Sequence, residues 1–274
     1  MPKTPFDVGF IGTGNMGAML VRAFLRSGSI EAKNVWAANR SQQKLEVLAS
    51  EFPGIHRDHA SHVAQRSDVL FLAVKPGDTK NVLETIQDSL RPDQLCVFLT
   101  NVFSFEQLEQ RLPCAVAKLI PTVTQQIGRG VALLAHGQRA TSEHTLRLEK
   151  LLAGTCTPLI IKEHQMRLFA DIASCGPAFL AVCIEEICRQ ALAFNGTLSA
   201  EDLTAACIET LGATADLLRT GMTPQQLVCE VAVPGGMTEA GIAALRRLLP
   251  QLLASVFSAT RQTEQQKGQL FSLD

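Results

Sequence analysis

Several features that define whole classes of protein are missing from this 274-residue sequence. No segment approaches the roughly 18 consecutive apolar residues that a membrane-spanning helix needs. Positive charge is not in excess either, because 25 Lys and Arg stand against 26 Asp and Glu, and the pI is near 6.6. Binding to nucleic acid or to an anionic membrane normally shows as a basic excess. We therefore expect neither nucleic acid nor an anionic membrane as the binding partner, and we expect a small molecule instead.

Signals of export and of disorder are also lacking. The first residues lead directly into a strand-like run with no apolar signal-peptide core, so we expect a cytoplasmic protein. There is no internal repeat and no low-complexity tract. A composition of 46% hydrophobic and 19% charged residues is instead typical of a soluble globular protein with one large or two ordinary domains.

The eight cysteines form neither a metal pattern nor a disulfide pattern. No two are spaced as C-x-x-C, and most lie in apolar surroundings, as Cys183 and Cys207 do, which predicts buried reduced thiols. His56, His59 and His62 fall close together, but the segment is polar and we find no acidic or cysteine partner at ligand spacing. We interpret them as solvated surface histidines and expect no metal site.

What is present centres on the run V-G-F-I-G-T-G-N-M-G at positions 8–17. An apolar strand-like stretch stops at three glycines spaced G-x-G-x-x-G, and a helical pattern follows over residues 18–26. Gly12 permits the tight turn, Gly14 lets the backbone approach a pyrophosphate, and Gly17 lets the helix pack close to the strand. The first N–H groups of the helix would then face the phosphate. This order predicts a dinucleotide-binding turn, although glycines also punctuate ordinary turns.

The choice of dinucleotide is expected to depend on the end of the second predicted strand, residues 34–38. A site that prefers NAD carries an acidic residue there for the ribose hydroxyls, whereas an arginine accommodates a 2′-phosphate. No carboxylate ends this strand, and Asn39, Arg40 and Ser41 follow it. Arg40 therefore favours NADP. The alternative is that Arg40 is a solvated loop residue.

Short apolar runs alternate with helical patterns as far as residue 135. Further strands are predicted at residues 69–74, 95–99, 115–120 and 131–135, with helices at 42–52 and 78–90 between them. Ser104 and Gln107 stand at the spacing of a capping box, which marks another helix start. This alternation predicts an α/β fold with a doubly wound sheet and a ligand crevice at the carboxyl ends of the strands.

The pattern changes at about residue 162. Long helical patterns cover residues 177–194, 200–220 and 242–263, with glycine-containing breaks at 174–177 and 233–238 ahead of two of them. We therefore predict a dinucleotide-binding domain over residues 1–161 and an all-helical domain over residues 162–274. The helical domain is thin around its own core, so we expect its apolar helices to pack against a second subunit.

With these motifs in place, the chain resembles the pyrroline-5-carboxylate reductase family over nearly its whole length. The resemblance rests on G-F-I-G-T-G-N-M-G at 9–17, N-R-S at 39–41, A-V-K-P at 73–76, S-C-G-P-A-F at 174–179 and P-G-G-M-T at 234–238. The family pairs a Rossmann domain with an all-α dimerisation domain and reduces 1-pyrroline-5-carboxylate to L-proline with NADPH. A homodimer through the helical domain is implied, with room for a larger oligomer of dimers.

The resemblance also implies which residues form the site. The cofactor-binding residues would be Gly12, Thr13, Gly14, Asn15, Met16, Asn39, Arg40, Ser41, Val74, Lys75 and Pro76. The substrate-binding residues would be Cys175, Gly176, Pro177, Gly235, Gly236 and Thr238. Thr238 would be the catalytic residue, hydrogen-bonded to the ring nitrogen or the carboxylate of the imine. Its alternative role is that of an ordinary helix-capping threonine. The two glycine loops would offer backbone N–H donors to the carboxylate.

Several positions depart from the family pattern. Members usually read G-S-G-P-A-Y where this chain has Cys175, so an expected hydroxyl is a thiol. They usually read R-x-M-P-N-T where this chain has Lys118 and Thr122, and an A-A-G turn where it has 101–103. A lysine common before the P-G-G loop is Glu230 here. Several departures, notably S-C-G-P-A-F at 174–179 and the P-C-x-V-A-x-x-I-P run at 113–121, are similar to the late-competence ComER-type branch of the family. Two alternatives to the reductase therefore stay open, a change of imine substrate and a regulatory paralogue that binds NADP.

Overall fold

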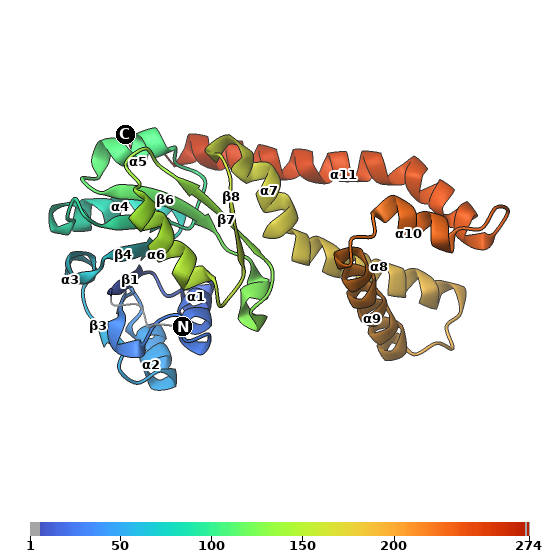
Figure 1. The fold of residues 1–274 in the computed structure, drawn as a ribbon, viewed down its shortest axis with the longest axis horizontal. Coiled ribbons are helices and arrows are strands. Elements are labelled where there is room, and N and C mark those ends of the chain that lie inside the picture. The colour runs from blue at the N-terminus through green and yellow to red at the C-terminus, as the bar shows by residue number, and fades with distance from the viewer. Residues whose placement is uncertain (1–5, 272, 274) are drawn as a thin grey trace. The chain divides into compact units, whose positions relative to one another are not determined.

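The chain divides into two compact units in the computed structural model, which describes residues 6–271 and 273 (Figure 1). One unit comprises Met1–Pro177 together with Arg261–Asp274, and the other comprises Ala178–Thr260. The N-terminal stretch 1–5, where we expect no export signal, lies outside the described residues. By compactness the first unit thus extends beyond the expected boundary after residue 161. The reason is that α7 (Met166–Ala173) packs against strand β7 (Val131–His136) instead of joining the helices that follow.

The first unit is built on one sheet of eight strands in the order β3-β2-β1-β4-β5-β6-β7-β8. Besides β7, the strands are β1 (Val8–Ile11), β2 (Val35–Ala38), β3 (His56–Arg57), β4 (Val69–Leu72), β5 (Leu95–Phe98), β6 (Ala115–Ile120) and β8 (Thr157–Ile160). Neighbouring strands are parallel except for β6 and β7. The predicted doubly wound α/β sheet is confirmed, with one antiparallel pair. The edge strands β3 and β8 were not predicted, because β3 has two exposed residues and β8 carries a proline and is largely exposed.

Helices cover both faces of this sheet, and alternate strand residues point into two separate cores. One core lies under α1 (Asn15–Arg26), α2 (Gln42–Glu51) and α6 (Ser142–Leu152). The other lies under α3 (Ala60–Arg66), α4 (Pro76–Ile86), α5 (Phe105–Arg111) and α7. In β4, for example, Phe71 joins the first core, where its ring stacks on Phe10 at 4.8 Å, and Leu72 joins the second. The predicted capping box at Ser104 is confirmed at the start of α5.

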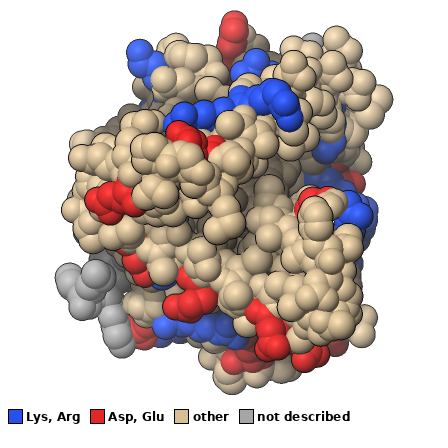
Figure 2. All heavy atoms as spheres, turned by 90° about the vertical axis from the view of Figure 1, so that its right-hand side faces the viewer, with Lys and Arg blue, Asp and Glu red and all other residues tan. Residues whose placement is uncertain are grey.

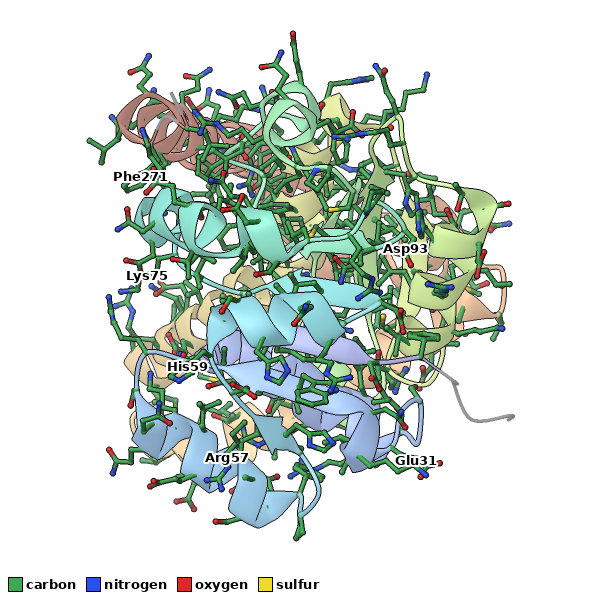
Figure 3. All side chains as sticks on the ribbon, turned by 90° about the vertical axis from the view of Figure 1, so that its left-hand side faces the viewer. Glu31, Arg57, His59, Lys75, Asp93 and Phe271 are labelled. Atoms are coloured by element: carbon green, nitrogen blue, oxygen red, sulfur yellow. The ribbon has the colours of Figure 1, made fainter. Side chains whose placement is uncertain are left out.

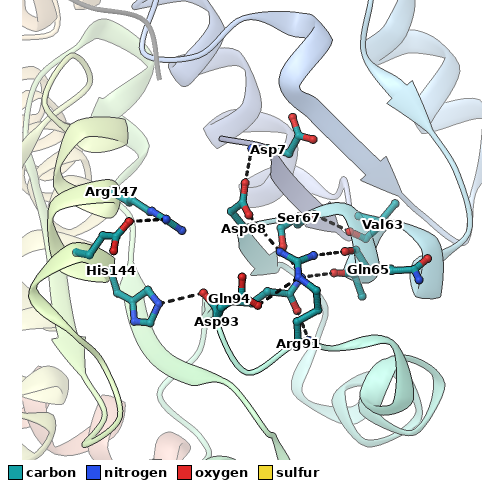
Figure 4. A network of polar contacts seen from close by, with 12 residues as sticks. Asp7, Val63, Gln65, Ser67, Asp68, Arg91, Asp93, Gln94, His144 and Arg147 are labelled. Atoms are coloured by element: carbon teal, nitrogen blue, oxygen red, sulfur yellow. Dashed lines mark hydrogen bonds and ion pairs between the residues drawn. The ribbon is translucent and has the colours of Figure 1, made fainter. Parts of the chain in front are cut away.

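Polar side chains close the amino ends of the central strands (Figure 4). The amide of Asp7 donates to Asp68 Oδ2 at 2.9 Å, and Arg91 Nη2 lies 3.1 Å from the other oxygen of that carboxylate. Gln94, which is fully buried, donates to the carbonyl of Ala64 at 2.7 Å. His144 contacts the carbonyl of Asp93 at 3.3 Å. Because these polar groups satisfy one another's hydrogen bonds, the amino ends of the strands serve the stability of the sheet. The carboxyl ends of the strands are then left for ligand binding.

The second unit is helical throughout its described residues. It contains most of α8 (Gly176–Phe194), α9 (Ala200–Arg219), α10 (Pro224–Val231) and most of α11 (Met237–Leu270), which confirms the predicted all-α region. Cys188 is the one hydrophobic residue of 178–260 that is buried in the single chain. The prediction of buried thiols is therefore wrong for Cys183, which is exposed, and for Cys207, which is half-buried. Apolar side chains on these helices therefore stay exposed in the single chain, because no other part of that chain covers them.

Candidate functional site

The glycine turn has the geometry that its spacing predicts. Gly12 adopts φ +99° and donates its amide to the carbonyl of Ala38 at 2.8 Å, and a Cβ there would lie 2.5 Å from the Ala73 carbonyl oxygen. A Cβ on Gly17 would collide with the carbonyl oxygen of Gly12. By contrast, a Cβ on Gly14 would meet nothing within 4 Å. Gly12 and Gly17 thus allow close packing, and Gly14 leaves open space for a phosphate.

The start of α1 suits an anion. Gly14 is its N-cap and offers no side chain to the first helical amides, and the first turn contains no acidic residue. Next to it, the Thr13 amide donates to Asn39 Oδ1 at 3.1 Å, and Asn39 Nδ2 donates to the Ser41 carbonyl at 3.0 Å. The hydroxyl oxygen of Thr13 is buried and has no hydrogen-bond partner among the described residues. These features fit a dinucleotide, because uncapped helix amides and an orphaned hydroxyl favour an outside acceptor or donor.

Arg40 extends from the loop after β2 with 91% of its side chain exposed. Its Nη1 lies 3.7 Å from Asp78 Oδ1, in the first turn of α4. The sequence shows no acidic residue at the end of the second strand, but the fold brings the Asp78 carboxylate close to Arg40 from the start of α4. An exposed ion pair of this kind contributes about 0–1 kcal/mol, so it leaves Arg40 available to a phosphate.

The predicted cofactor residues Val74, Lys75 and Pro76 lie in the turn between β4 and α4. Lys75 is the exposed N-cap residue of α4 and Pro76 is its first helical residue. The ring of Phe271 lies beside the next residue, Gly77, so that a Cβ on Gly77 would come within 3.0 Å of that ring. Figure 3 labels Lys75 and Phe271. The end of α11 therefore reaches the turn in which the cofactor is expected.

The predicted substrate loop around Cys175 is continuous with the end of α7. The amides of Ser174 and Cys175 both donate to the carbonyl of Ala170, at 3.0 and 2.9 Å. The expected free N–H donors are therefore not found at these two positions. Ser174 Oγ donates to the Pro121 carbonyl at 2.8 Å, which attaches the loop to the end of β6. The half-buried Cys175 thiol lies 3.6 Å from Arg167 Nη2.

The second predicted loop, ahead of α11, belongs to the other unit. Gly235 adopts φ +74° and donates its amide to Glu239 Oε2 at 2.7 Å, and the Gly236 amide donates to the Val233 carbonyl at 3.0 Å. The two backbone N–H groups that were expected to bind the substrate carboxylate therefore already donate hydrogen bonds within the chain. The Gly235 amide binds the Glu239 carboxylate, in the place expected for the carboxylate of the substrate. Thr238 is exposed in the first turn of α11. Because Cys175 and Thr238 lie in different units, their meeting at one pocket stays a prediction.

A cavity of about 630 Å³ borders the glycines of this second loop. Its lining comes from α10, the loop and the start of α11, and includes Cys229, Gly235, Gly236, Glu239 and Arg246. One carboxylate and one guanidinium therefore face the cavity together with the loop. Sequence reasoning missed Glu239 and Arg246, which lie on one face of α11 seven residues apart, a spacing that marks a shared helix face.

Lys118 is a functional candidate that appeared in the sequence only as a departure from the family pattern. It is 1% exposed in β6, and its Nζ lies 2.5 Å from Glu163 Oε1 and 3.4 Å from Asn101 Oδ1. Burial lowers the pKa of its ammonium, and the neighbouring Glu163 carboxylate offsets part of this effect. Nζ also lies 4.8 Å from the centre of the Phe105 ring. The signal that could have identified Lys118 in the sequence is a charged residue inside an otherwise apolar strand.

Two other predicted features have structural roles. Thr122 is 1% exposed and exchanges capping hydrogen bonds with Gln125 at the start of the short 3₁₀ helix η3 (Val123–Ile127). In the histidine cluster, the His56 ring stacks on Trp36 at 4.2 Å and His62 Nδ1 contacts the Asp58 carboxylate. Asp58 is thus an acidic neighbour of this cluster that the sequence analysis did not name. No group of three His, Cys, Asp or Glu that could hold a metal occurs among residues 6–271 and 273.

Comparisons with known proteins cover both units. Residues 7–101 match the family described as NADP oxidoreductase, coenzyme F420-dependent, and residues 163–267 match the pyrroline-5-carboxylate reductase dimerisation family. ComE operon protein 4 of Bacillus subtilis is 31% identical over 255 residues, which cover 92% of this chain and 93% of that protein. Pyrroline-5-carboxylate reductase of Escherichia coli is 27% identical over 233 residues, covering 84% and 86%.

Solved structures share the fold at low identity. The structure of a pyrroline-5-carboxylate reductase from Coxiella burnetii superposes with a TM-score of 0.85 at 24% identity and covers 96% of this chain and 99% of that chain. Plasmodium falciparum pyrroline carboxylate reductase with NADP bound superposes with a TM-score of 0.83 at 20% identity, covering 98% and 99%. Similarity of this kind establishes the two-part architecture.

Proposed function

The chain belongs to the pyrroline-5-carboxylate reductase family, and from this premise we propose that it reduces 1-pyrroline-5-carboxylate to L-proline with NADPH. It is an oxidoreductase of the kind that acts on a CH–NH group. The observation that carries the proposal is the open cradle at Gly14 and the uncapped start of α1, in a chain whose second region matches the dimerisation family of these reductases. NADP is the cofactor that this cradle and Arg40 fit.

The reaction asks little acid–base chemistry of the protein. NADPH, when bound, supplies a hydride to the imine carbon, while a proton goes to the ring nitrogen. The chain's own residues would bind and orient: Gly14 and the α1 amides take the pyrophosphate, and Arg40 takes the 2′-phosphate. Cys175 and Thr238 would hold the imine, with Thr238 hydrogen-bonded to its ring nitrogen or carboxylate. Glu239 would have to release the Gly235 amide before that amide could bind a carboxylate.

The function is tested by following NADPH oxidation with 1-pyrroline-5-carboxylate and with a panel of other cyclic imines. Complementation of a proline auxotroph provides the second arm. We expect turnover of pyrroline-5-carboxylate and growth without proline. Absence of both, with NADPH still bound, would contradict the assignment.

A second candidate function is supported by the 31% identity to ComE operon protein 4 and by the changes at Cys175, Thr122 and Lys118. In that case the chain binds NADP but acts on another imine or serves a regulatory role. The imine panel separates the two, because a regulatory paralogue binds NADPH and turns over none of the imines.

We also propose that the protein is a cytoplasmic homodimer joined through its helical region. By length and composition alone, the helical segments 163–194 and 237–270 could each cross a membrane. The match of residues 163–267 to a dimerisation family instead supports a second copy as the cover for their apolar faces. On the face shown in Figure 2, Lys and Arg side chains lie interspersed with Asp and Glu side chains. A larger oligomer of dimers is compatible with this arrangement.

A further inference from the structure

Five polar side chains form one chain of contacts in the first unit. Lys118 Nζ donates to Asn101 Oδ1 at 3.4 Å, and Asn101 Nδ2 donates to Glu264 Oε1 at 3.1 Å. Arg167 Nη1 lies 3.8 Å from the same Glu264 oxygen, and Arg167 Nη2 lies 3.6 Å from Cys175 Sγ. Asn101, Lys118 and Cys175 are all positions at which the sequence departs from the family pattern. Changes that lie far apart in the sequence are thus linked through Glu264, which contacts Asn101 directly and Cys175 by way of Arg167.

The charge and the partial burial of Arg167 explain how the Glu264 carboxylate can affect the orientation of that side chain. The Arg167 side chain is 24% exposed and its Nη2 lies 2.5 Å from Asp171, a residue that is 1% exposed. Arg167 Nε is buried and has no hydrogen-bond partner among the described residues. The orientation of the guanidinium therefore depends on the contacts of its two Nη atoms, with Asp171 on one side and Glu264 on the other. Half-buried charge pairs in such a setting are screened less by solvent than exposed ones.

The backbone of the Cys175 loop is held independently. The hydrogen bond from Ser174 Oγ to the Pro121 carbonyl attaches the loop to β6, whereas Arg167 contacts the Cys175 side chain. Glu264 lies in the last turns of α11, the part of that helix that returns to the first unit. The end of the C-terminal helix is therefore connected, through two side chains, to the loop proposed to hold the substrate.

We infer that Glu264 is a positioning residue for the Cys175 loop. Together with Asp171, it fixes the Arg167 guanidinium whose Nη2 contacts the thiol, and it thereby influences where the Cys175 side chain stands and which cyclic imine the loop accepts. This inference rests on the proposed function in one respect, namely that Cys175 faces the imine. The Asn101, Lys118 and Cys175 departures are then one connected set.

Glu264→Gln separates the two contacts of the carboxylate. The amide oxygen of glutamine still accepts from Asn101, but the variant lacks the charge that attracts Arg167. We expect KM for the imine to rise about three- to fivefold, the size of a partly exposed ion pair, with kcat and the NADPH Kd unchanged. Glu264→Asp should restore part of the loss, and Gln265→Ala, exposed on the same turn, is the matched control. Equal falls in kcat, NADPH affinity and Tm would indicate a merely structural role and overturn the inference.

A second readout needs no turnover. Alkylation of Cys175 by iodoacetamide in the folded protein, measured by peptide mass spectrometry, reports on where the half-buried side chain stands, because the rate depends on access of the reagent to the thiol. We expect Glu264→Gln to speed this alkylation about threefold, because a thiol that is no longer held against Arg167 is more accessible, Arg167→Gln to speed it similarly, and the double variant to add little further. An unchanged or slower rate in Glu264→Gln, or additive effects, would overturn the inference. Should the parent reduce no pyrroline-5-carboxylate, the proposed function fails while this readout still decides the role of Glu264.

Discussion

At the scale of single residues, Arg40 is expected to select the cofactor. Its exposed guanidinium offers two charge-assisted hydrogen bonds to a 2′-phosphate, worth about 1.5–3 kcal/mol. Arg40→Asp should therefore raise the NADPH Kd roughly ten- to a hundredfold and make NADH the tighter ligand. Isothermal titration with both cofactors measures this. Lys44→Asp, an exposed change of the same sign on α2, is the control and should alter neither Kd much.

The Asp78 carboxylate beside Arg40 provides a complementary check. Asp78→Asn removes the exposed ion pair and should tighten NADPH binding by no more than about fivefold. Tighter binding of NADH than of NADPH by the unmodified protein would show that the NADP assignment is wrong.

Cys175 is predicted to weaken the hold on the substrate. A thiol is a poorer donor than a hydroxyl, so Cys175→Ser should improve kcat/KM for pyrroline-5-carboxylate about fivefold, the value of one neutral hydrogen bond. Steady-state kinetics at saturating NADPH measure the change. Thr238→Ala should lower kcat/KM and leave NADPH affinity nearly unchanged. A serine variant that is no better than the parent would indicate that this side chain does not contact the substrate.

Lys118 should give the stability a distinctive pH dependence. Burial lowers the pKa of its ammonium below the ordinary 10.5, so the unfolded chain binds more protons than the folded protein in the range just below 10.5. The contribution of Lys118 to the free energy of unfolding must then rise with pH across that range. Urea unfolding at several pH values should show this rise in the parent and its loss in Lys118→Met. The difference between the two proteins cancels other titrating groups, and equal slopes would contradict the prediction.

At the scale of secondary-structure elements, the end of α11 is predicted to stabilise the turn before α4. Phe271 is half-buried against Gly77, next to Lys75 and Pro76. Phe271→Ala should lower the free energy of unfolding by about 1–2 kcal/mol, less than for a fully buried ring, and should weaken NADPH binding. Thermal unfolding with and without NADPH measures both effects. Gln269→Ala, exposed on the same helix, is the control, and an unchanged Tm for Phe271→Ala would refute the packing role.

At the scale of the whole molecule, the apolar faces of the helical unit predict a stable dimer. Beyond its first turn, the part of α11 that belongs to the second unit exposes five large apolar residues. They are Leu245, Leu248, Leu249, Leu252 and Leu253. An exposed apolar surface of this extent normally marks an interface. Leu252→Glu should yield monomers in analytical ultracentrifugation at micromolar concentration, whereas Gln251→Glu should leave the dimer intact. A monomeric parent protein would contradict the dimer.

Much of this molecule could be predicted from the sequence because the signals are local. The strand before Gly12, the glycine spacing and the helix after Gly17 occupy one short run, and the structure reproduces the steric role of each glycine. The capping box at Ser104 is equally local. The edge strand β3 was missed because its two residues are polar and exposed, and β8 was missed because it carries a proline and is largely exposed.

The polar contacts of the site depended on tertiary structure. Asp78 reaches Arg40, and Glu264 joins Asn101 to Arg167 across more than half of the chain. Sequence periodicity records which face of an element is apolar, and a turn records its own backbone needs. A contact between two polar side chains leaves no such period, because its geometry is set only when separate elements pack. The sequence by itself therefore determined the family, the alternation of the central strands with helices and the glycine turn, and the fold decided which charges meet there.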